Sequence, residues 1–329
     1  MVLLAIDGVR WQEVFQGVDP MLAEEHDLPE DERVPASALM PNLHALAARG
    51  GVLLGAPDSG TGVFATGPEL VSLPGYAEML TGRRVSGCRD NGCRGTAAPT
   101  LVDEIASSPS TRVEDVAVVT SWPDIGRVAA KRPDRIAMTT GRNGGPTREL
   151  FRRDPVTAKL VDEASRLKPA PGVGDFRPDR HTARIAVRYL ETKHPRFLFV
   201  ALGEPDEYAH HGNYPGYLQA LRHADLAIAE LSHALSERAR AGSRTVLFVT
   251  ADHGRAADFV NHGQKYPESA RVWLFAWGTE VSAGSDLGDP GERRLADLAP
   301  TLRKLLGLAE DRDQAAGHAI LGLLEGHPG

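Results

Sequence analysis

A carboxylate and an imidazole stand side by side directly after an apolar run in this sequence. Residues 245–249 are apolar and β-prone, which predicts a buried parallel strand, and Asp252 and His253 follow its C-terminal end. Open α/β sheets bind their ligands at that end of the strands. Asp252 offers an oxygen ligand and His253 a nitrogen ligand, and Gly254 permits a sharp turn beneath them. An Asp at a strand end can also be a helix N-cap, so this pair alone does not define a site.

Two further apolar runs are followed by the same types of residue. Residues 2–6 predict a central strand that ends at Asp7, and residues 197–202 predict another that is followed by Asp206 and His210. Asp206 and His210 are four residues apart, so on a helical turn they share one face and can reach one ion. Crossovers of one hand bring the ends of parallel strands to the same edge of a sheet. We therefore expect these side chains to meet the Asp-His pair there.

The expected cluster predicts a site for divalent cations. Carboxylates gathered in one place repel each other unless a cation neutralises them. His262, a few residues beyond the Asp-His pair, adds a further imidazole. The mixture of Asp and His favours zinc, or manganese, over calcium, which prefers oxygen ligands alone.

A serine hydroxyl is predicted at the start of a helix. Pro74 suits the first turn of a helix, so Ser72 is expected just before that helix begins. Unpaired N–H groups and the helix dipole favour an anion at such a place. Ser72 is therefore either a plain N-cap or a nucleophile that receives a phosphoryl group.

The elements that position these residues alternate between strand and helix. This order predicts one α/β domain over residues 1–329, with a doubly wound, mostly parallel sheet and helices on both faces. Residues 41–50 and 179–193 are expected to be helices, and residues 272–278 a strand. Residues 85–179 are rich in Arg, Pro and Gly, and we expect this segment to be a loop-rich insertion that forms a partial cap.

Composition narrows the class of partner to small molecules. The chain has 329 residues and a formal net charge of -7, which argues against a nucleic-acid-binding surface. No apolar run approaches the roughly 20 residues that a membrane-spanning helix needs. The chain as given shows no signal peptide, so we expect a cytoplasmic protein if Met1 is the native start, and a periplasmic or secreted one if a leader was removed. The sequence does not indicate an oligomeric state.

The two cysteines, Cys88 and Cys93, leave two interpretations open. They either form a disulfide that closes a tight loop, which would point to an oxidising compartment, or stay free thiols.

The motifs taken together resemble those of the alkaline phosphatase superfamily. The nearest branches are those of nucleotide pyrophosphatase/phosphodiesterase-like and phosphonoacetate hydrolase-like enzymes. The resemblance spans most of the chain and is weak over residues 88–179. It rests on Asp7, Pro41-Asn42-Leu43, Ser72, Asp206 with His210, the run Thr250-Ala251-Asp252-His253-Gly254, His262-Gly263 and Ala299-Pro300-Thr301-Leu302.

The resemblance implies a site for two divalent ions around a serine nucleophile. One ion would be held by Asp206, His210 and His262. The other would be held by Asp7, Asp252, His253 and the Ser72 oxygen. The implied substrate is a small phosphate monoester or diester, or a phosphonate, and Ser72 would pass through a phosphoserine intermediate.

The sequence departs from the phosphodiesterase pattern next to the nucleophile. That branch usually has Thr as nucleophile and an Asn three residues later, where this chain has Ser72 and Gly75. Asn91, or an Arg of the insertion, could replace the missing amide. Gly75 and Asn91 are accordingly the expected substrate-binding residues.

Three alternatives accompany this interpretation. Ser72-Leu73-Pro74 also resembles the signature of sulfatases, which would make the protein a sulfuric-ester hydrolase. Cofactor-independent phosphoglycerate mutases share a similar order of ligands but carry a large inserted domain. A protein that keeps the metals without catalysis is the third alternative, because a fold alone does not determine function.

Overall fold

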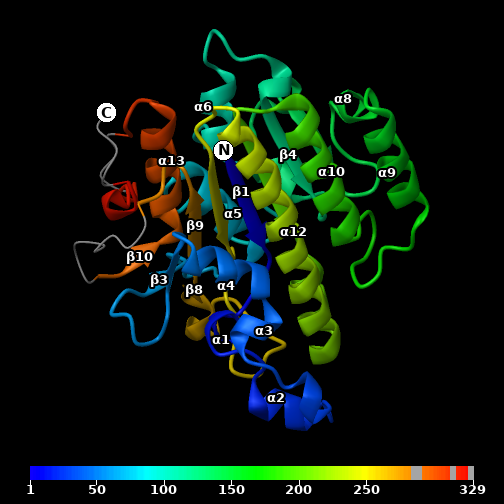
Figure 1. Cartoon of the computed structure of the whole chain (residues 1–329), viewed down its shortest axis with the longest axis vertical. Helices are drawn as coiled ribbons and strands as arrows, with labels where there is room; N and C mark the ends of the chain where they lie inside the picture. The colour runs from blue at the N-terminus through cyan, green and yellow to red at the C-terminus, as the bar shows by residue number, and fades with distance from the viewer. Residues whose placement is uncertain (283–290, 312–315, 325–329) are drawn as a thin grey trace.

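The computed structural model describes residues 1–282, 291–311 and 316–324 of the chain. Its centre is a seven-stranded sheet with the order β2-β9-β7-β1-β6-β4-β5 (Figure 1). All neighbouring strands are parallel except that β9 runs antiparallel to both β7 and β2. The predicted mostly parallel sheet is confirmed. The strands are β1 Val2–Ile6, β2 Val52–Leu54, β4 Val116–Thr120, β5 Ala137–Thr140, β6 Phe197–Leu202, β7 Val246–Thr250 and β9 Leu274–Gly278.

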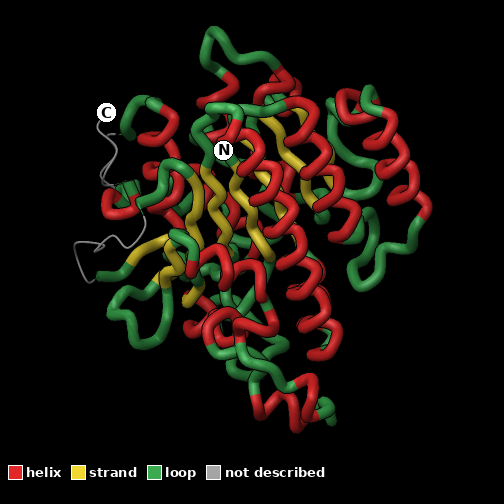
Figure 2. The backbone as a smooth tube through the Cα atoms, viewed as in Figure 1, coloured by secondary structure: helices red, strands yellow, loops and turns green. Residues whose placement is uncertain are grey.

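Helices cover both faces of this sheet, so its central strands are buried on both sides and, apart from Thr250 at the end of β7, are apolar. One face carries α4 Pro41–Ala48, α10 Asp179–Lys193 and α12 Tyr214–Arg240 (Figures 1 and 2). The other carries α5 Ser72–Thr81, α6 Leu101–Ala106, α7 Ile125–Ala129 and α13 Leu298–Leu306. The remaining α-helices are α1 Trp11–Phe15, α2 Pro20–Glu25, α3 Ala36–Leu39, α8 Glu149–Arg152, α9 Pro155–Arg166 and α11 Glu204–His210.

A small second sheet lies beside the main one. It consists of β3 Val63–Phe64, β8 Arg271–Val272 and β10 Arg293–Arg294, in the order β10-β3-β8. The single strand expected over residues 272–278 is therefore wrong at its start, because Val272 pairs with β3 while β9 begins at Leu274. Trp273 separates the two strands, and its indole Nε1 donates to the Val9 carbonyl at 3.3 Å.

The segment of residues 85–179 contributes two strands to the main sheet. Both β4 and the edge strand β5 belong to it, as does the helix α9. We did not expect β5, because Ala137-Met138-Thr139-Thr140 is short, is only partly apolar and follows a stretch rich in Pro and Arg. The role of this segment as a partial cap stays a prediction.

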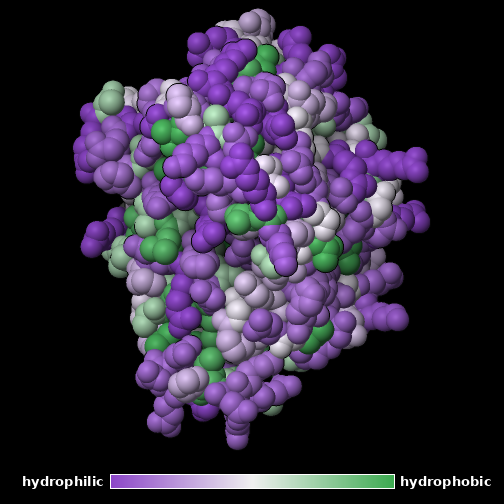
Figure 3. Space-filling model, turned by 90° about the vertical axis from the view of Figure 1, so that its right-hand side faces the viewer, coloured by the Kyte–Doolittle hydropathy of each residue, from purple (hydrophilic) through white to green (hydrophobic). Residues whose placement is uncertain are grey.

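The surface over α8 and α9 is mostly hydrophilic, and its apolar side chains form small separate groups (Figure 3). Within the described part of the chain, no helix combines the length and the apolar character that crossing a membrane requires.

Three strands set the position of the site. β1 pairs with β6 through Ile6 and Leu202, and with β7 through Ala5 and Thr250. The three strands thus end at about the same level, and the Asp7 N–H donates to the Leu202 carbonyl at 2.9 Å. The residues that follow these strands leave the sheet next to one another.

Candidate active site

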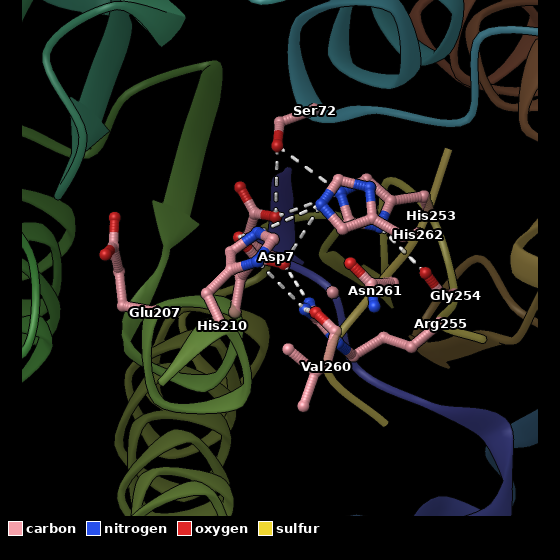
Figure 4. A network of polar contacts seen from close by, with 12 residues as sticks. Asp7, Ser72, Glu207, His210, His253, Gly254, Arg255, Val260, Asn261 and His262 are labelled. Atoms are coloured by element: carbon pink, nitrogen blue, oxygen red, sulfur yellow. Dashed lines mark hydrogen bonds and ion pairs between the residues drawn. The ribbon is translucent and has the colours of Figure 1, made fainter. Parts of the chain in front are cut away.

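The predicted metal ligands lie together at the C-terminal ends of β1, β6 and β7. Figure 4 shows the imidazoles gathered around Asp7, with the Ser72 hydroxyl pointing toward them. Each comes from a different place in the fold. Asp7 follows β1, Asp252 and His253 follow β7, Asp206 and His210 lie on α11 after β6, Ser72 begins α5, and His262 lies on the loop that follows β7.

Asp7, Asp252 and His253 form a buried group around Ser72. Ser72 Oγ lies 3.4 Å from Asp7 Oδ1 and 3.3 Å from His253 Nε2. His253 Nε2 in turn lies 3.4 Å from Asp7 Oδ1 and 3.6 Å from Asp252 Oδ2. All four side chains are buried, so charge on them is poorly screened by water.

Asp206, His210 and His262 form an adjacent group. Asp206 Oδ2 lies 3.1 Å from His210 Nε2, and Asp206 Oδ1 lies 3.9 Å from His262 Nε2. The Nε2 atoms of the two histidines are 3.0 Å apart. The His210 side chain is 43% exposed whereas that of His262 is 7% exposed, so the site meets solvent at His210.

Two of the histidines present the same nitrogen to the site. His253 Nδ1 lies 2.9 Å from the Gly254 carbonyl, and His262 Nδ1 lies 3.0 Å from the Leu70 carbonyl. A carbonyl can only accept a hydrogen bond, so each Nδ1 carries the proton and each Nε2 keeps its lone pair. Backbone partners of this kind orient the imidazoles of metal sites.

Electrostatics separate the carboxylates into two kinds. Burial, together with the neighbouring carboxylates, raises the pKa of Asp7 and of Asp252 well above the ordinary value. Burial acts in the same direction on Asp206, but the Arg255 guanidinium and His210 bring its pKa well below the ordinary value. Burial also lowers the pKa of His253, which keeps this imidazole neutral and available as a ligand.

The donor set fits divalent cations. Asp252 Oδ1 accepts from the Gly8 N–H at 3.1 Å, whereas the buried Oδ2 has no hydrogen-bond partner among the described residues. A buried carboxylate oxygen without a partner is costly unless a cation compensates it. One ligand atom each of Asp7, Asp252 and His253 lies within 4.8 Å of the others, and the same holds for Asp206, His253 and His262.

The helix α5 directs its N-terminus into the site. It begins at Ser72 with Val71 as N-cap, so the serine is the first helical residue instead of the one before it. One turn later, the Tyr76 hydroxyl donates to Asp7 Oδ2 at 3.1 Å. Ser72 therefore has a fixed position relative to Asp7.

Gly75 lies where α5 crosses the backbone of Asp252. A Cβ atom at Gly75 would be 2.3 Å from the Asp252 carbonyl oxygen, so only glycine allows this approach. The substrate-binding role expected for Gly75 stays a prediction.

We expect Gly75→Ala to disturb the site through packing. The added methyl group must push α5 away from Asp252, which we expect to destabilise the protein by about 1–3 kcal/mol and to weaken metal binding. Thermal unfolding and metal titration measure the two effects. Gly87→Ala is the matched control, because a Cβ there meets no heavy atom of the described residues within 4 Å. Equal behaviour of the two variants would contradict the packing argument.

Cys88 and Cys93 form a disulfide, which settles the alternative that the sequence left open. Asn91 lies in the loop that this bond closes, and its Oδ1 accepts from the Leu73 N–H at 3.0 Å. The amide is therefore held beside the start of α5, one residue from Ser72. Its expected contact with substrate stays a prediction.

Arg255 is a residue of this site that the sequence analysis missed. Its guanidinium is fully buried and pairs with Asp206. The available signal was its place directly after Asp252-His253-Gly254, where a cation adjoins an expected metal site.

Comparisons with known proteins point to metalloenzymes. A family model described as the Metalloenzyme superfamily matches residues 167–310. A 2,3-bisphosphoglycerate-independent phosphoglycerate mutase from Gloeobacter violaceus is 29% identical over 167 residues, which are 45% of this chain and 28% of the mutase. The chain thus spans less than a third of the length of this curated relative.

Solved structures share the fold at low sequence identity. Wild-type alkaline phosphatase PafA superposes with a TM-score of 0.59 at 10% identity and 98% coverage of both chains. BT1596, a 2-O GAG sulfatase, gives a TM-score of 0.58 at 14% identity, over 99% of this chain and 74% of the sulfatase. At such identities the likeness concerns the fold alone.

Proposed function

We propose that this chain is a metalloenzyme of the alkaline phosphatase superfamily that hydrolyses small phosphate esters with Ser72 as the nucleophile, since a Metalloenzyme superfamily model matches residues 167–310 and the fold is shared with an alkaline phosphatase. The observation that carries this proposal is the position of Ser72 Oγ, within 3.4 Å of both a carboxylate and an imidazole of the candidate metal site. A plain N-cap serine would bond to its own helix, whereas α5 has no side-chain cap at Val71 and the Ser72 hydroxyl faces the ligands.

The proposed cofactors are two divalent ions, zinc or manganese. Asp206, His210 and His262 would hold one ion, and Asp7, Asp252, His253 and Ser72 the other. When bound, such a pair of ions lowers the pKa of a serine hydroxyl, orients the phosphoryl group and neutralises charge on the leaving oxygen. One ligand atom of His253 lies within 4.8 Å of ligand atoms of both groups, and its ring stacks on that of His262 with centroids 3.9 Å apart, so His253 stands between the two proposed ions.

The residues of the chain then divide the reaction into two displacements. Ser72 Oγ forms a bond to phosphorus, gives up its proton, and the bond from phosphorus to the ester oxygen breaks; Asp7 Oδ1, at 3.4 Å, is the nearest carboxylate acceptor for that proton. The alcohol leaves with a proton from solvent. Water entering at the exposed His210 side then attacks phosphorus, which releases phosphate and restores the Ser72 hydroxyl.

The start of α5 provides the binding site for the phosphoryl oxygens. An anion at a helix N-terminus binds to unpaired backbone N–H groups. At the start of α5, Leu73 gives its N–H to Asn91, Pro74 has none and Gly75 gives its N–H to the Val71 carbonyl, so among the described residues the Ser72 N–H is the backbone donor for the substrate. Asn91 stands at the same end, where its side-chain nitrogen can donate to the substrate while Oδ1 holds the Leu73 N–H. Because these donors are fixed before substrate binds, they need little rearrangement as charge develops.

Transfer of a phosphoryl group to a second hydroxyl, as in a mutase, is the alternative that a specific observation favours. The curated relative described above is a phosphoglycerate mutase, although this chain covers only 28% of its length. A sulfuric-ester hydrolase shares the fold and differs in the atom that Ser72 attacks.

Metal analysis combined with a substrate panel tests the proposal. We expect two equivalents of zinc or manganese per chain, and release of phosphate from 4-nitrophenyl phosphate or bis(4-nitrophenyl) phosphate. The panel also contains a phosphonate ester, 4-nitrophenyl sulfate and 3-phosphoglycerate. Turnover of the sulfate alone would indicate a sulfatase, and isomerisation of phosphoglycerate a mutase. A metal-loaded protein that is inactive on every compound would support a non-catalytic role.

A further inference from the structure

Arg255 joins two separate parts of the chain that carry ligands. Its Nη1 pairs with Asp206 Oδ1 on α11. On its other side, Nε donates to the Phe259 carbonyl at 2.6 Å and Nη2 to the Val260 carbonyl at 2.5 Å. Val260 precedes His262 by two residues. One guanidinium thus connects the carboxylate of one ligand to the loop that carries another.

The same group also reaches the third ligand of this set. Arg255 Nη2 lies 3.4 Å from His210 Nδ1. Because the Arg255 side chain is fully buried, its bonds to Asp206 and to the Phe259 and Val260 carbonyl groups are stronger than they would be on a surface. Only arginine offers several N–H donors in a planar fork; a lysine ammonium carries the charge but does not present this fork to acceptors on both segments.

The backbone of Phe259 and Val260 is oriented so that both carbonyl groups accept hydrogen bonds from Arg255. Phe259 has φ of 64°, in the left-handed region that a bulky residue rarely adopts. Its buried ring packs edge-on against Tyr214 and Tyr217, with centroids 5.2 and 5.1 Å away. A backbone conformation of this kind costs about 1–3 kcal/mol and persists only where packing enforces it. Here the packing turns two successive carbonyl groups toward Arg255.

The backbone of Gly8 packs directly against the pair of Asp206 and Arg255. Its φ is +63°, and a Cβ at this position would lie 2.4 Å from Asp206 Oδ1 and 2.8 Å from Arg255 Nη1. The pair of Asp206 and Arg255 is therefore packed against the backbone that follows β1. Neither group can move without displacing the other or the loop.

We propose that Arg255 is a positioning residue for one of the two metal ions, the one assigned to Asp206, His210 and His262. This inference rests on the proposed two-metal function. Arg255 pairs with the Asp206 carboxylate on α11, and through the Phe259 and Val260 carbonyl groups it holds the loop of His262 next to that helix. Among the residues that the structure describes, Arg255 makes no hydrogen bond or ion pair with the ligands Asp7 and Asp252.

Metal stoichiometry of Arg255 variants tests the inference. Arg255→Met removes both the charge and the fork, whereas Arg255→Lys keeps the charge and removes the fork. Loss of an outer partner typically weakens metal binding 10–100-fold, so under limiting metal we expect both variants to bind one equivalent where the wild type binds two. Equilibrium dialysis with elemental analysis gives the stoichiometry, and competition with a chelator gives the affinities.

Arg303→Lys is the matched control. Arg303 is also buried and also connects a carboxylate, that of Glu104 at 2.7 Å, to a backbone carbonyl, that of Thr81 at 3.1 Å. It belongs to α13, away from the ligands, so this variant should keep two equivalents. Comparing the two lysine variants separates loss of a metal site from the general effect of losing a buried arginine.

The possible results separate a failure of the positioning role of Arg255 from a failure of the proposed two-metal function. Two equivalents bound with wild-type affinity by Arg255→Lys would show that charge alone suffices and would overturn the positioning role. If Arg255→Met does not fold, Arg255→Lys decides alone, because it keeps the buried charge. A wild-type protein that binds no metal would instead refute the proposed function.

Discussion

The Ser72→Ala variant should fold, keep at least the metal ion farther from the serine, and lose nearly all turnover. We expect kcat to fall by roughly 10³-fold or more, as for other covalent nucleophiles. The change removes one oxygen atom from the first residue of α5 and leaves the backbone donors of that helix in place. A thermal unfolding temperature near that of the wild type would confirm that the loss is chemical.

Trapping of a phosphoserine sharpens this prediction. Rapid acid quenching with a ³²P-labelled ester should give labelled wild-type protein, with the label at Ser72 by peptide mapping, and unlabelled Ser72→Ala. Ser86→Ala is the control, because Ser86 is exposed and no proposed step uses it. Turnover by Ser72→Ala within twofold of the wild type would exclude the serine as nucleophile and point to direct attack by water.

The parts of the fold that could be predicted are those where local sequence and tertiary environment agree. β1 and β6 have the expected bounds because they are continuous apolar runs buried on both faces. The edge strand β5 could not be found in this way, since pairing with β4 on one side places Thr139 and Thr140 in a strand despite their weak apolar pattern.

The sequence allowed us to predict which residues are the candidate ligands, but not which other side chains bind to them. Asp7, Asp206 and the Asp-His pair could be placed because each follows a predicted strand, and parallel strands end at one edge. The partnership of Arg255 with Asp206 joins residues 49 apart in sequence, and that of Tyr76 with Asp7 joins residues 69 apart. No periodicity or local motif encodes such pairs, because they depend on how helices pack on the sheet.

Asp252→Asn should separate the effect of this carboxylate on stability from its effect on activity. The asparagine keeps an oxygen for the Gly8 N–H, which lies 3.1 Å from Asp252 Oδ1. It replaces the unpartnered, buried Oδ2 by a neutral group of the same size. Because that oxygen is a proposed metal ligand, we expect the affinity for the ion at Ser72 to fall by about 100-fold and phosphatase activity to be lost.

In the metal-free protein, we expect Asp252→Asn to raise the free energy of unfolding at neutral pH. Burial raises the pKa of Asp252 in the folded state above its unfolded value, so the folded protein binds more protons between the two values. Stability of the metal-free protein therefore falls as pH rises through that window. Asp252→Asn removes this contribution, and each unit of the pKa difference corresponds to about 1.4 kcal/mol. Without metal, the variant should be more stable than the wild type at neutral pH and nearly equal to it in acid.

Denaturant unfolding of chelator-treated wild type and Asp252→Asn at several pH values measures this difference. Adding zinc should then reverse the order at neutral pH, since metal that binds only the folded state stabilises the wild type more than the variant. If the variant is less stable than the wild type without metal, the folded protein itself stabilises the Asp252 carboxylate, and its role is structural. If zinc stabilises both proteins equally, Asp252 is no ligand. The predicted reversal occurs only if the buried Asp252 carboxylate destabilises the metal-free protein and binds an ion in the metal-loaded one.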